Sequence, residues 1–300
     1  MSGRALALWR QLEQATGRAL LVTTGGLDHR SGHEIQALFD VLSAHSVVCA
    51  LLSAREATER WPHLHFEAEV LYQPEAGVID PELTMAETTR LAERNGAQVL
   101  REVAVEAIEP AASGVKIKLK DRTLQARRVV CAVGPWTPTL LGRVAQLPSL
   151  TVTQQTVFHF ARRQSGFDPW PIVFHEVDRM VYGLPGGRDG GVPGNMKLGE
   201  HAPGPTTSAD GGNGVVDADA RRRMVEYVRR WWPGLEPEPV AEYDCLYTWT
   251  PSEDFFIQRH GRLVVCSACS GHAAKFTPLI GEWLADLVEG RKLPFTRFAR

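Results

Sequence analysis

The chain has 300 residues, of which 44% are hydrophobic, and a formal net charge of −2 at pH 7. It is long enough for two domains or one large one, and its balanced charge offers no basic footprint for nucleic acid or for an anionic membrane surface. No stretch approaches the ~20 uninterrupted apolar residues of a membrane-spanning helix.

Two features indicate the compartment. Five cysteines are an odd, low number for this length, so we expect no disulfide framework, and a reducing environment fits better. The apolar residues of 1–18 are interrupted by Arg10, Gln11 and Glu13, which is typical of an amphipathic helix and not of a signal peptide. We predict a cytoplasmic location.

The first half of the chain alternates between helical and extended patterns. Apolar spacing predicts three helices, at 6–16, 32–43 and 81–94. It predicts strands at 19–23, 47–52, 98–108, 115–119 and 129–133. Ser53, with Glu56 three residues later, predicts a capping box at the start of a further short helix.

The next segment is rich in strands. Residues 151–161, 172–184 and 195–201 have strand patterns, and alternation in the last places Lys197 and His201 on one face. Residues 186–194 and 203–214 are expected to be loops. Residues 217–232 predict an amphipathic helix with a basic face, which we interpret as a solvated surface in preference to a docking patch. That face consists of Arg221, Arg222, Arg223, Arg229 and Arg230.

The C-terminal region carries the clearest functional pattern. Alternation along the strand at 243–257 places Cys245, Tyr247 and Trp249 on one face, which suits a flat aromatic ligand. A short buried strand at 263–268, the small-residue loop 270–275 and a helix follow. We expect Thr277 to be the N-cap of this helix, Pro278 its first residue and Gly290 its end. Open α/β sheets hold ligands with such a strand, loop and helix N-terminus.

Cys266 and Cys269, separated by two residues, allow three interpretations. They could form a redox-active thiol pair, or a zinc site together with His260 or His272, or they could be two incidental cysteines. A redox pair usually opens a helix directly, whereas the loop 270–276 intervenes here, and the spacing does not supply a complete zinc set. Incidental cysteines are favoured.

Two motifs in this region carry a family resemblance. Residues 245–257 read C-L-Y-T-W-T-P-S-E-D-F-F-I, and residues 270–276 read S-G-H-A-A-K-F. In this order and spacing they resemble the sarcosine oxidase family of FAD-dependent amine oxidases, a group with monomeric sarcosine oxidase, N-methyltryptophan oxidase and peroxisomal sarcosine/pipecolate oxidase. The opening L-W-x-x-L-E-x-x-T-G at 8–17 and the block 96–141 are also similar to that family.

The resemblance implies a mixed α/β fold, in which a partial, Rossmann-like FAD-binding domain is interleaved with a β-sheet substrate domain. The expected substrate-domain parts are residues 1–74, with a linking helix, and 151–250. The expected FAD-domain parts are residues 75–150 and 251–300.

The resemblance also implies an activity. Such an enzyme oxidises the CH–NH bond of a secondary or N-methyl amino acid to an imine and passes the electrons to O2, giving H2O2. Cys245 matches the cysteine that forms a thioether to the flavin; because a thiolate is required, positive charge is expected nearby. Lys197 matches the lysine that promotes reaction with O2, since a fixed cation stabilises the negative charge that develops on oxygen.

Further positions match residues around the substrate and the flavin. His201, Tyr247 and Tyr182 are expected to face the substrate, and Lys275 to help hold its carboxylate. The remaining expected FAD contacts are Val105 at the adenine end, Gly134, Gly271, His272, Ala274 and Lys275. This sequence departs from the family pattern at Val181 and at Ala273-Ala274, so the identity of the substrate does not carry over.

One family feature is not found. The 300 residues contain no G-x-G-x-x-G, the fingerprint that binds the FAD pyrophosphate in the family. The alternative is therefore a truncated, non-catalytic remnant, or one half of a split protein whose missing N-terminal strand a second chain supplies. A further alternative is a dehydrogenase that passes electrons to a partner in place of O2.

Overall fold

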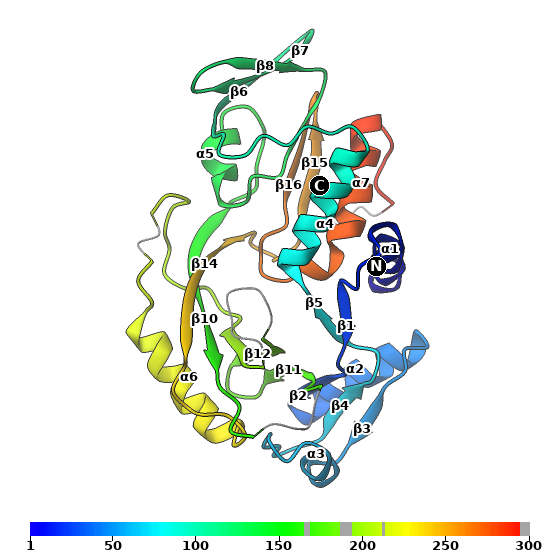
Figure 1. Cartoon of the computed structure of the whole chain (residues 1–300), viewed down its shortest axis with the longest axis vertical. Helices are drawn as coiled ribbons and strands as arrows, with labels where there is room; N and C mark the ends of the chain where they lie inside the picture. The colour runs from blue at the N-terminus through cyan, green and yellow to red at the C-terminus, as the bar shows by residue number, and fades with distance from the viewer. Residues whose placement is uncertain (165–168, 187–193, 212–213, 295–300) are drawn as a thin grey trace.

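The structure is a computed structural model that describes residues 1–164, 169–186, 194–211 and 214–294. Figure 1 shows two parts, a lower one built around a large sheet and an upper one built around helices and smaller sheets. The long strands β10 (Thr151–Phe160) and β14 (Ala241–Trp249) run from the lower part toward the upper one. The short strands β1 (Leu21–Thr23) and β5 (Gly77–Ile79) pair with each other and also link the two parts.

The large sheet has eight strands, in the order β14-β10-β13-β12-β11-β2-β4-β3. The further strands are β13 (Met196–Glu200), β12 (Met180–Pro185), β11 (Ile172–Glu176), β2 (Gly26–Arg30), β4 (Val70–Gln73) and β3 (Ala50–Leu52). All neighbours are antiparallel except β11 and β2, which are parallel. The β-rich patterns at 151–161, 172–184 and 195–201 are thus confirmed as strands.

One face of this sheet is the main core. Alternate residues such as Phe158, Phe160 and Leu198 are buried there against Val228 and Trp231 of α6 (Ala218–Trp231). The helix α3 (Ala54–Arg60) contributes Ala57 to the same core, and α2 (Gly32–Ala44) also packs near the sheet. Because strand side chains alternate between faces, the residues between these core positions point to the opposite face.

The upper part holds two smaller cores. In its central sheet β16 (Leu263–Ser267) pairs with β15 (Phe256–His260) and, in parallel, with β9 (Val129–Cys131). One core lies under α7 (Thr277–Glu289) and includes Ala5 of α1 (Ser2–Thr16). The other lies between β16, α5 (Thr137–Leu141) and the sheet of β6 (Val105–Ala111), β7 (Gly114–Leu119) and β8 (Thr123–Ala126). The helix α4 (Pro81–Arg94) contacts α1.

The contacts of α1 bear on the expected domain division. This helix packs against α7 of the upper part, although residues 1–74 were assigned to the substrate domain. The division at 74, 150 and 250 remains a prediction.

Most local expectations are confirmed, with several differences. The capping box of Ser53 and Glu56 is present. Thr277 is not the N-cap: a 3-10 turn at Ala274–Phe276 runs into α7, and the Thr277 hydroxyl donates to the carbonyl of Ala274 (2.9 Å). Residues 98–104 form no strand, since β6 begins at Val105. The strands β2, β4, β5 and β8 and the helix α5 were not predicted. The strand expected over 243–257 is divided into β14 and β15.

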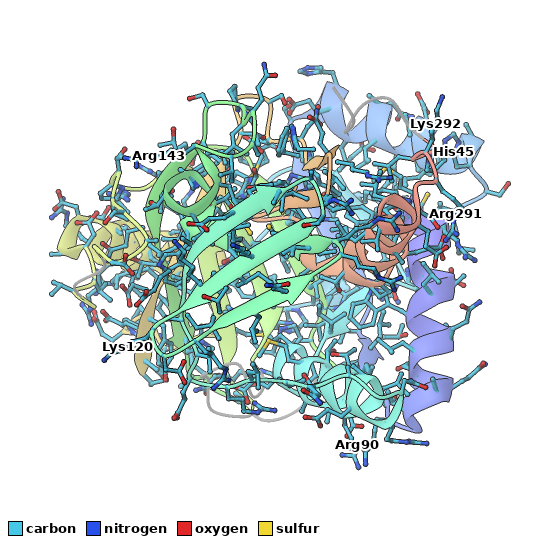
Figure 2. All side chains as sticks on the ribbon, turned by 90° about the horizontal axis from the view of Figure 1, so that it is seen from above. His45, Arg90, Lys120, Arg143, Arg291 and Lys292 are labelled. Atoms are coloured by element: carbon cyan, nitrogen blue, oxygen red, sulfur yellow. The ribbon has the colours of Figure 1, made fainter. Side chains whose placement is uncertain are left out.

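The arginines of α6 are neutralised within the chain. Arg221 pairs with Glu242 (2.5 Å), Arg223 with Glu200 (3.1 Å) and Arg230 with Asp178 (2.7 Å). The five arginine side chains are still 32–65% exposed, in agreement with a solvated basic face. Figure 2 labels basic side chains of other elements at the periphery, with His45, Arg291 and Lys292 grouped at one edge. Among the described residues no helix is both long and apolar enough to cross a membrane.

Candidate functional site

Four neighbouring strands bring the expected site residues onto the sheet face opposite α6. Tyr182 of β12 lies beside Gly199 of β13, and Lys197 of β13 lies beside His159 of β10. Cys245 of β14 lies beside Gln155 of β10. Cross-strand partners share a face, and so do residues two or four positions apart on one strand, such as Lys197 and Gly199 or Gln155 and His159. Tyr182, Lys197 and Cys245 therefore project from the same side.

Glycine at 199 allows Tyr182 to lie across the neighbouring strand. A Cβ at Gly199 would lie 2.6 Å from the Tyr182 hydroxyl oxygen, a distance that side chains do not tolerate. Tyr182 also forms a hydrogen bond with Tyr247. Burial is the main cause that raises the pKa of Tyr247, so its hydroxyl remains protonated and able to donate at neutral pH.

The second motif packs directly on the first. Gly271 has φ +87°, and a Cβ there would clash with the ring of Tyr247 and lie 2.9 Å from Cε1 of His201. The amide of Thr248 donates to the carbonyl of Cys269 (3.0 Å), and the buried Ser270 hydroxyl lies 3.4 Å from the carbonyl of Thr248. The loop after β16 therefore forms one wall of the site, and only glycine fits at 271.

His201 lies at the end of β13 among aromatic rings. Its ring centroid is 6.1 Å from that of Tyr247 and 5.3 Å from that of Trp249. The Trp249 indole donates to the hydroxyl of Thr153 (2.7 Å). Nε2 of His201 is 3.4 Å from Oε2 of Glu253. Tyr247 and Trp249 share a face, as the alternation of the strand predicted.

Cys245 is exposed on this sheet face. Surrounding protein atoms raise the pKa of its thiol, and the Lys197 ammonium acts in the opposite direction. The positive charge expected beside a reactive thiol is thus present, but here it does not outweigh desolvation.

The loop 270–276 positions three further residues. His272 donates from Nε2 to the carbonyl of Glu253 (2.9 Å) and stacks on Phe255. Ala274 begins the 3-10 turn and is exposed. The Lys275 ammonium lies 5.5 Å from the centre of the Phe276 ring, and desolvation lowers its pKa. Lys275 therefore lies on the loop 270–276, with its ammonium against the ring of the neighbouring Phe276.

Gly134 and Val105 lie farther along the upper part. Gly134 has φ +52° and begins a 3-10 turn (Gly134–Trp136) that contacts β14; a Cβ there would lie 3.9 Å from Sγ of Cys269. Val105 begins β6 and pairs with Leu119, so it lies in the sheet β6-β7-β8 and not in the sheet that carries Cys245.

Cys266 and Cys269 do not form a disulfide or a metal site. All five cysteines are free, and burial raises the pKa of Cys266 to about 12. Within the ranges that the structure describes, no three His, Cys, Asp or Glu side chains group as metal ligands.

The residues present fit the ring end of a flavin. An exposed thiol, a nearby ammonium and a half-buried phenol share one face, and Gly271 presents backbone without a side chain beside them. The 300 residues contain no G-x-G-x-x-G, the loop that holds a dinucleotide pyrophosphate.

Sequence reasoning missed two residues of this site. Glu253 contacts both His201 and His272, and Thr153 accepts hydrogen bonds from Trp249 and Gln155. The strand pattern at 151–161 placed Thr153 on a strand without indicating its face. No local signal points to the contact of Glu253, which joins residues 52 positions apart.

Comparisons with known proteins agree with this geometry. The family model described as DAO, FAD dependent oxidoreductase, matches residues 1–287. The chain is 27% identical over 298 residues to the monomeric sarcosine oxidase of Bacillus sp. (strain NS-129), covering 95% of this chain and 76% of that protein. It is 26% identical over 312 residues to the N-methyl-L-tryptophan oxidase of Yersinia pestis (strain Pestoides F), covering 97% and 79%.

A solved structure shows the same fold. The open form of NikD, an unusual amino acid oxidase essential for nikkomycin biosynthesis, superimposes with a TM-score of 0.85 at 26% identity, covering 99% of this chain and 81% of that one. The mixed α/β fold predicted from the sequence is thereby confirmed. The family match extends over nearly the whole chain, and the chain belongs to the family of FAD-dependent oxidoreductases.

Proposed function

We propose that this FAD-dependent oxidoreductase oxidises the CH–NH bond of a secondary or N-methyl amino acid to an imine, with O2 as electron acceptor and H2O2 as product. The observation that carries the proposal is the convergence of Cys245, Lys197, Tyr182, Tyr247 and His201 on one sheet face beside Gly271. Two similar proteins are named for oxidation of sarcosine and of N-methyl-L-tryptophan, which supports this substrate class.

FAD, when bound, accepts the hydride equivalent of the amine. The side chains of this protein bind and orient the substrate. Tyr247, whose pKa is raised by burial, offers a protonated hydroxyl to a substrate carboxylate, with Tyr182 as its hydrogen-bond partner. Lys275 supplies a cation on the facing loop, and His201 closes the site beside Trp249.

Lys197 is proposed to promote the reaction with O2. A cation held beside the flavin stabilises the negative charge that O2 acquires as it is reduced. We expect Lys197→Met to slow H2O2 formation by about 10²-fold or more, by analogy with removal of one preorganised electrostatic donor. Anaerobic bleaching of the flavin by the amine should change much less. Equal losses in both measurements would contradict this role.

Cys245 is proposed to attach the flavin covalently. Its sulfur would hold the flavin ring through a thioether. Lys197 supplies the nearby positive charge that favours the thiolate. Gly134, Gly271, His272, Ala274 and Lys275 are proposed as further FAD contacts, and Val105 as a contact at the adenine end.

We further infer that a strand and helix from a second chain cover the free edge of the upper sheet. Within the described residues β9 pairs only with β16, and α4 buries no residue. Val130 of β9 is exposed, and so are Val99, Leu100 and Val103 in the segment between α4 and β6. An unpaired strand edge with exposed apolar residues is a site for strand addition.

A chain that does not bind FAD by itself is the second candidate. The 300 residues contain no G-x-G-x-x-G, and backbone amides at such a loop hold the pyrophosphate. These 300 residues alone would then keep the sheet face without the cofactor.

A visible absorption spectrum of the purified chain separates these candidates. A flavin spectrum that stays with the acid-precipitated protein supports covalent FAD, and Cys245→Ala should then release the colour. A colourless chain that takes up no added FAD, alone or with a strand-helix partner, supports the second candidate.

A peroxide assay with N-methyl amino acids distinguishes an oxidase from a dehydrogenase. We also propose a cytoplasmic location, which cell fractionation tests.

A further inference from the structure

Glu253 occupies an unusual backbone conformation beside the site. It lies in the turn after β14, where its amide donates to the carbonyl of Thr250 (3.1 Å) and the Thr250 hydroxyl donates to the carbonyl of Asp254 (2.8 Å). Its φ is +59°, in the left-handed region that favours glycine. A non-glycine residue in this conformation is strained, and such residues cluster at functional sites.

The backbone of Glu253 holds the loop that faces the sheet. Its carbonyl lies 2.9 Å from Nε2 of His272. A carbonyl oxygen only accepts, so Nε2 of His272 carries a proton. The His272 ring also stacks on Phe255, with 5.0 Å between ring centroids. This contact depends on the backbone of residue 253 and not on its side chain.

The side chain of Glu253 lies near His201, at the end of β13. Its Oε2 is 3.4 Å from Nε2 of His201, long for a hydrogen bond but within range of a small rotation of an exposed side chain. The Glu253 side chain is 52% exposed and that of His201 only 13%. An ionised carboxylate only accepts hydrogen bonds, so Nε2 of His201 is the donor and Nδ1 is the unprotonated nitrogen of the neutral ring.

We propose that Glu253 is a positioning residue for His201. Its carboxylate holds the imidazole in the Nε2–H tautomer, with the ring against Tyr247 and Trp249, while its carbonyl holds His272 on the facing loop. A single residue thereby sets the distance between β13 and the loop 270–276. The consequence for catalysis rests on the proposed function, whereas the tautomer does not.

The test uses the full chain with ¹⁵N-labelled histidine, observed by NMR about two pH units above the usual histidine pKa of ~6.5. Glu253→Gly removes the carboxylate, and glycine adopts a positive φ without strain, so the turn and its carbonyl remain. Glu253→Gln keeps an acceptor oxygen at the same place. His201→Asn and His272→Asn identify the two sets of signals.

The expected result is specific to one histidine. Wild type and E253Q show His201 as the Nε2–H tautomer, E253G shows a mixture of tautomers, and His272 is unchanged in all three. The proposal is overturned if His201 is the same in E253G as in the wild type, if His272 changes as much as His201, or if E253Q resembles E253G.

Enzyme kinetics provide an independent readout. In the FAD-loaded protein E253G is expected to lower kcat/KM by up to ~10²-fold, the size of effect that misplacement of a catalytic group produces, and E253Q to retain most of the activity. If the protein oxidises no amine but the His201 tautomer depends on the Glu253 carboxylate, the positioning role stands and the proposed oxidation fails.

Discussion

Gly271 joins the two motifs at the scale of a single residue. Its positive φ and its contact with the Tyr247 ring both exclude a side chain. The loop 270–276 can therefore approach the sheet this closely only because residue 271 has no Cβ.

Gly271→Ala should destabilise the protein and disturb the site. The left-handed φ and the clash with Tyr247 together cost about 1–3 kcal/mol, measured as a lower midpoint of urea unfolding. Gly281→Ala is the matched control: Gly281 lies inside α7 with nothing within 4 Å of its Cβ position, so it should raise stability by about 0.5–1 kcal/mol. Equal effects of the two substitutions would contradict the role of Gly271.

Glu253→Gly should separate stability from site geometry. Relief of the left-handed φ is worth about 1–2 kcal/mol, and the exposed contact of the carboxylate with His201 contributes about 0–1 kcal/mol. We therefore expect unfolding to require slightly more denaturant while the His201 environment changes. A clear loss of stability would show that the carboxylate stabilises the fold and not only the site.

At the scale of elements, β2, β11 and α6 enclose a pair of histidines. His29 and His175 are register partners on the parallel strands, with rings stacked at 4.8 Å between centroids. Nδ1 of His175 lies 2.6 Å from the Tyr227 hydroxyl of α6, and Trp231 packs edge-on against both rings. Nε2 of each histidine is buried without a hydrogen-bond partner in the described part of the chain.

This pair predicts loss of stability in mild acid. Burial lowers the pKa of His29 to about 4 and that of His175 to about 3, from an ordinary value of 6.5; Glu67 opposes the shift at His29, and Arg230 adds to that at His175. Because the unfolded chain binds these protons first, stability is full above pH 6.5 and falls as the pH drops toward 4. Each pKa unit is worth about 1.4 kcal/mol, so the loss is several kcal/mol.

Urea unfolding between pH 7 and 5 measures this loss, since few carboxylates titrate in that range. His175→Gln keeps an acceptor for the Tyr227 hydroxyl and removes one proton-binding site, so the dependence on pH should become weaker. An unchanged pH dependence would show that the pair does not control acid stability.

At the scale of the whole molecule, the site lies where the two parts meet. Tyr247 and His201 belong to the large sheet, whereas Gly271 and His272 belong to the upper part. The first helix supports this junction from outside, because the Trp9 indole donates to the carbonyl of Lys275 (2.9 Å). The site therefore forms only when the two parts and α1 are docked together.

Trp9→Phe should loosen the junction. It leaves the carbonyl of Lys275 without its donor, which costs about 1–3 kcal/mol when such a group is buried, and hydrogen exchange in residues 270–276 should become faster. Trp136→Phe is the control, because Trp136 is exposed and its bond to Asp210 (2.9 Å) lies at the surface. If both variants exchange at the wild-type rate, α1 does not support the loop.

Local sequence patterns were sufficient to predict many structural features of this protein. The alternation that places Tyr247 and Trp249 on one face, the capping box at Ser53 and the helix end at Gly290 each depend on residues a few positions apart. The same holds for the motifs at 245–257 and 270–276, which pointed to the FAD-dependent oxidoreductases before any contact was known. Such features follow from backbone geometry and side-chain period, which neighbouring residues determine.

The contacts that complete the site were decided by tertiary structure. The hydrogen bond of Tyr182 with Tyr247, the approach of Gly271 to His201 and the reach of Glu253 to His201 join distant segments. The prediction of Thr277 as an N-cap was wrong because a 3-10 turn leads directly into α7. Strand order, register and docking of the two parts set these contacts, and they depend on the packing of the whole core, which no local pattern encodes.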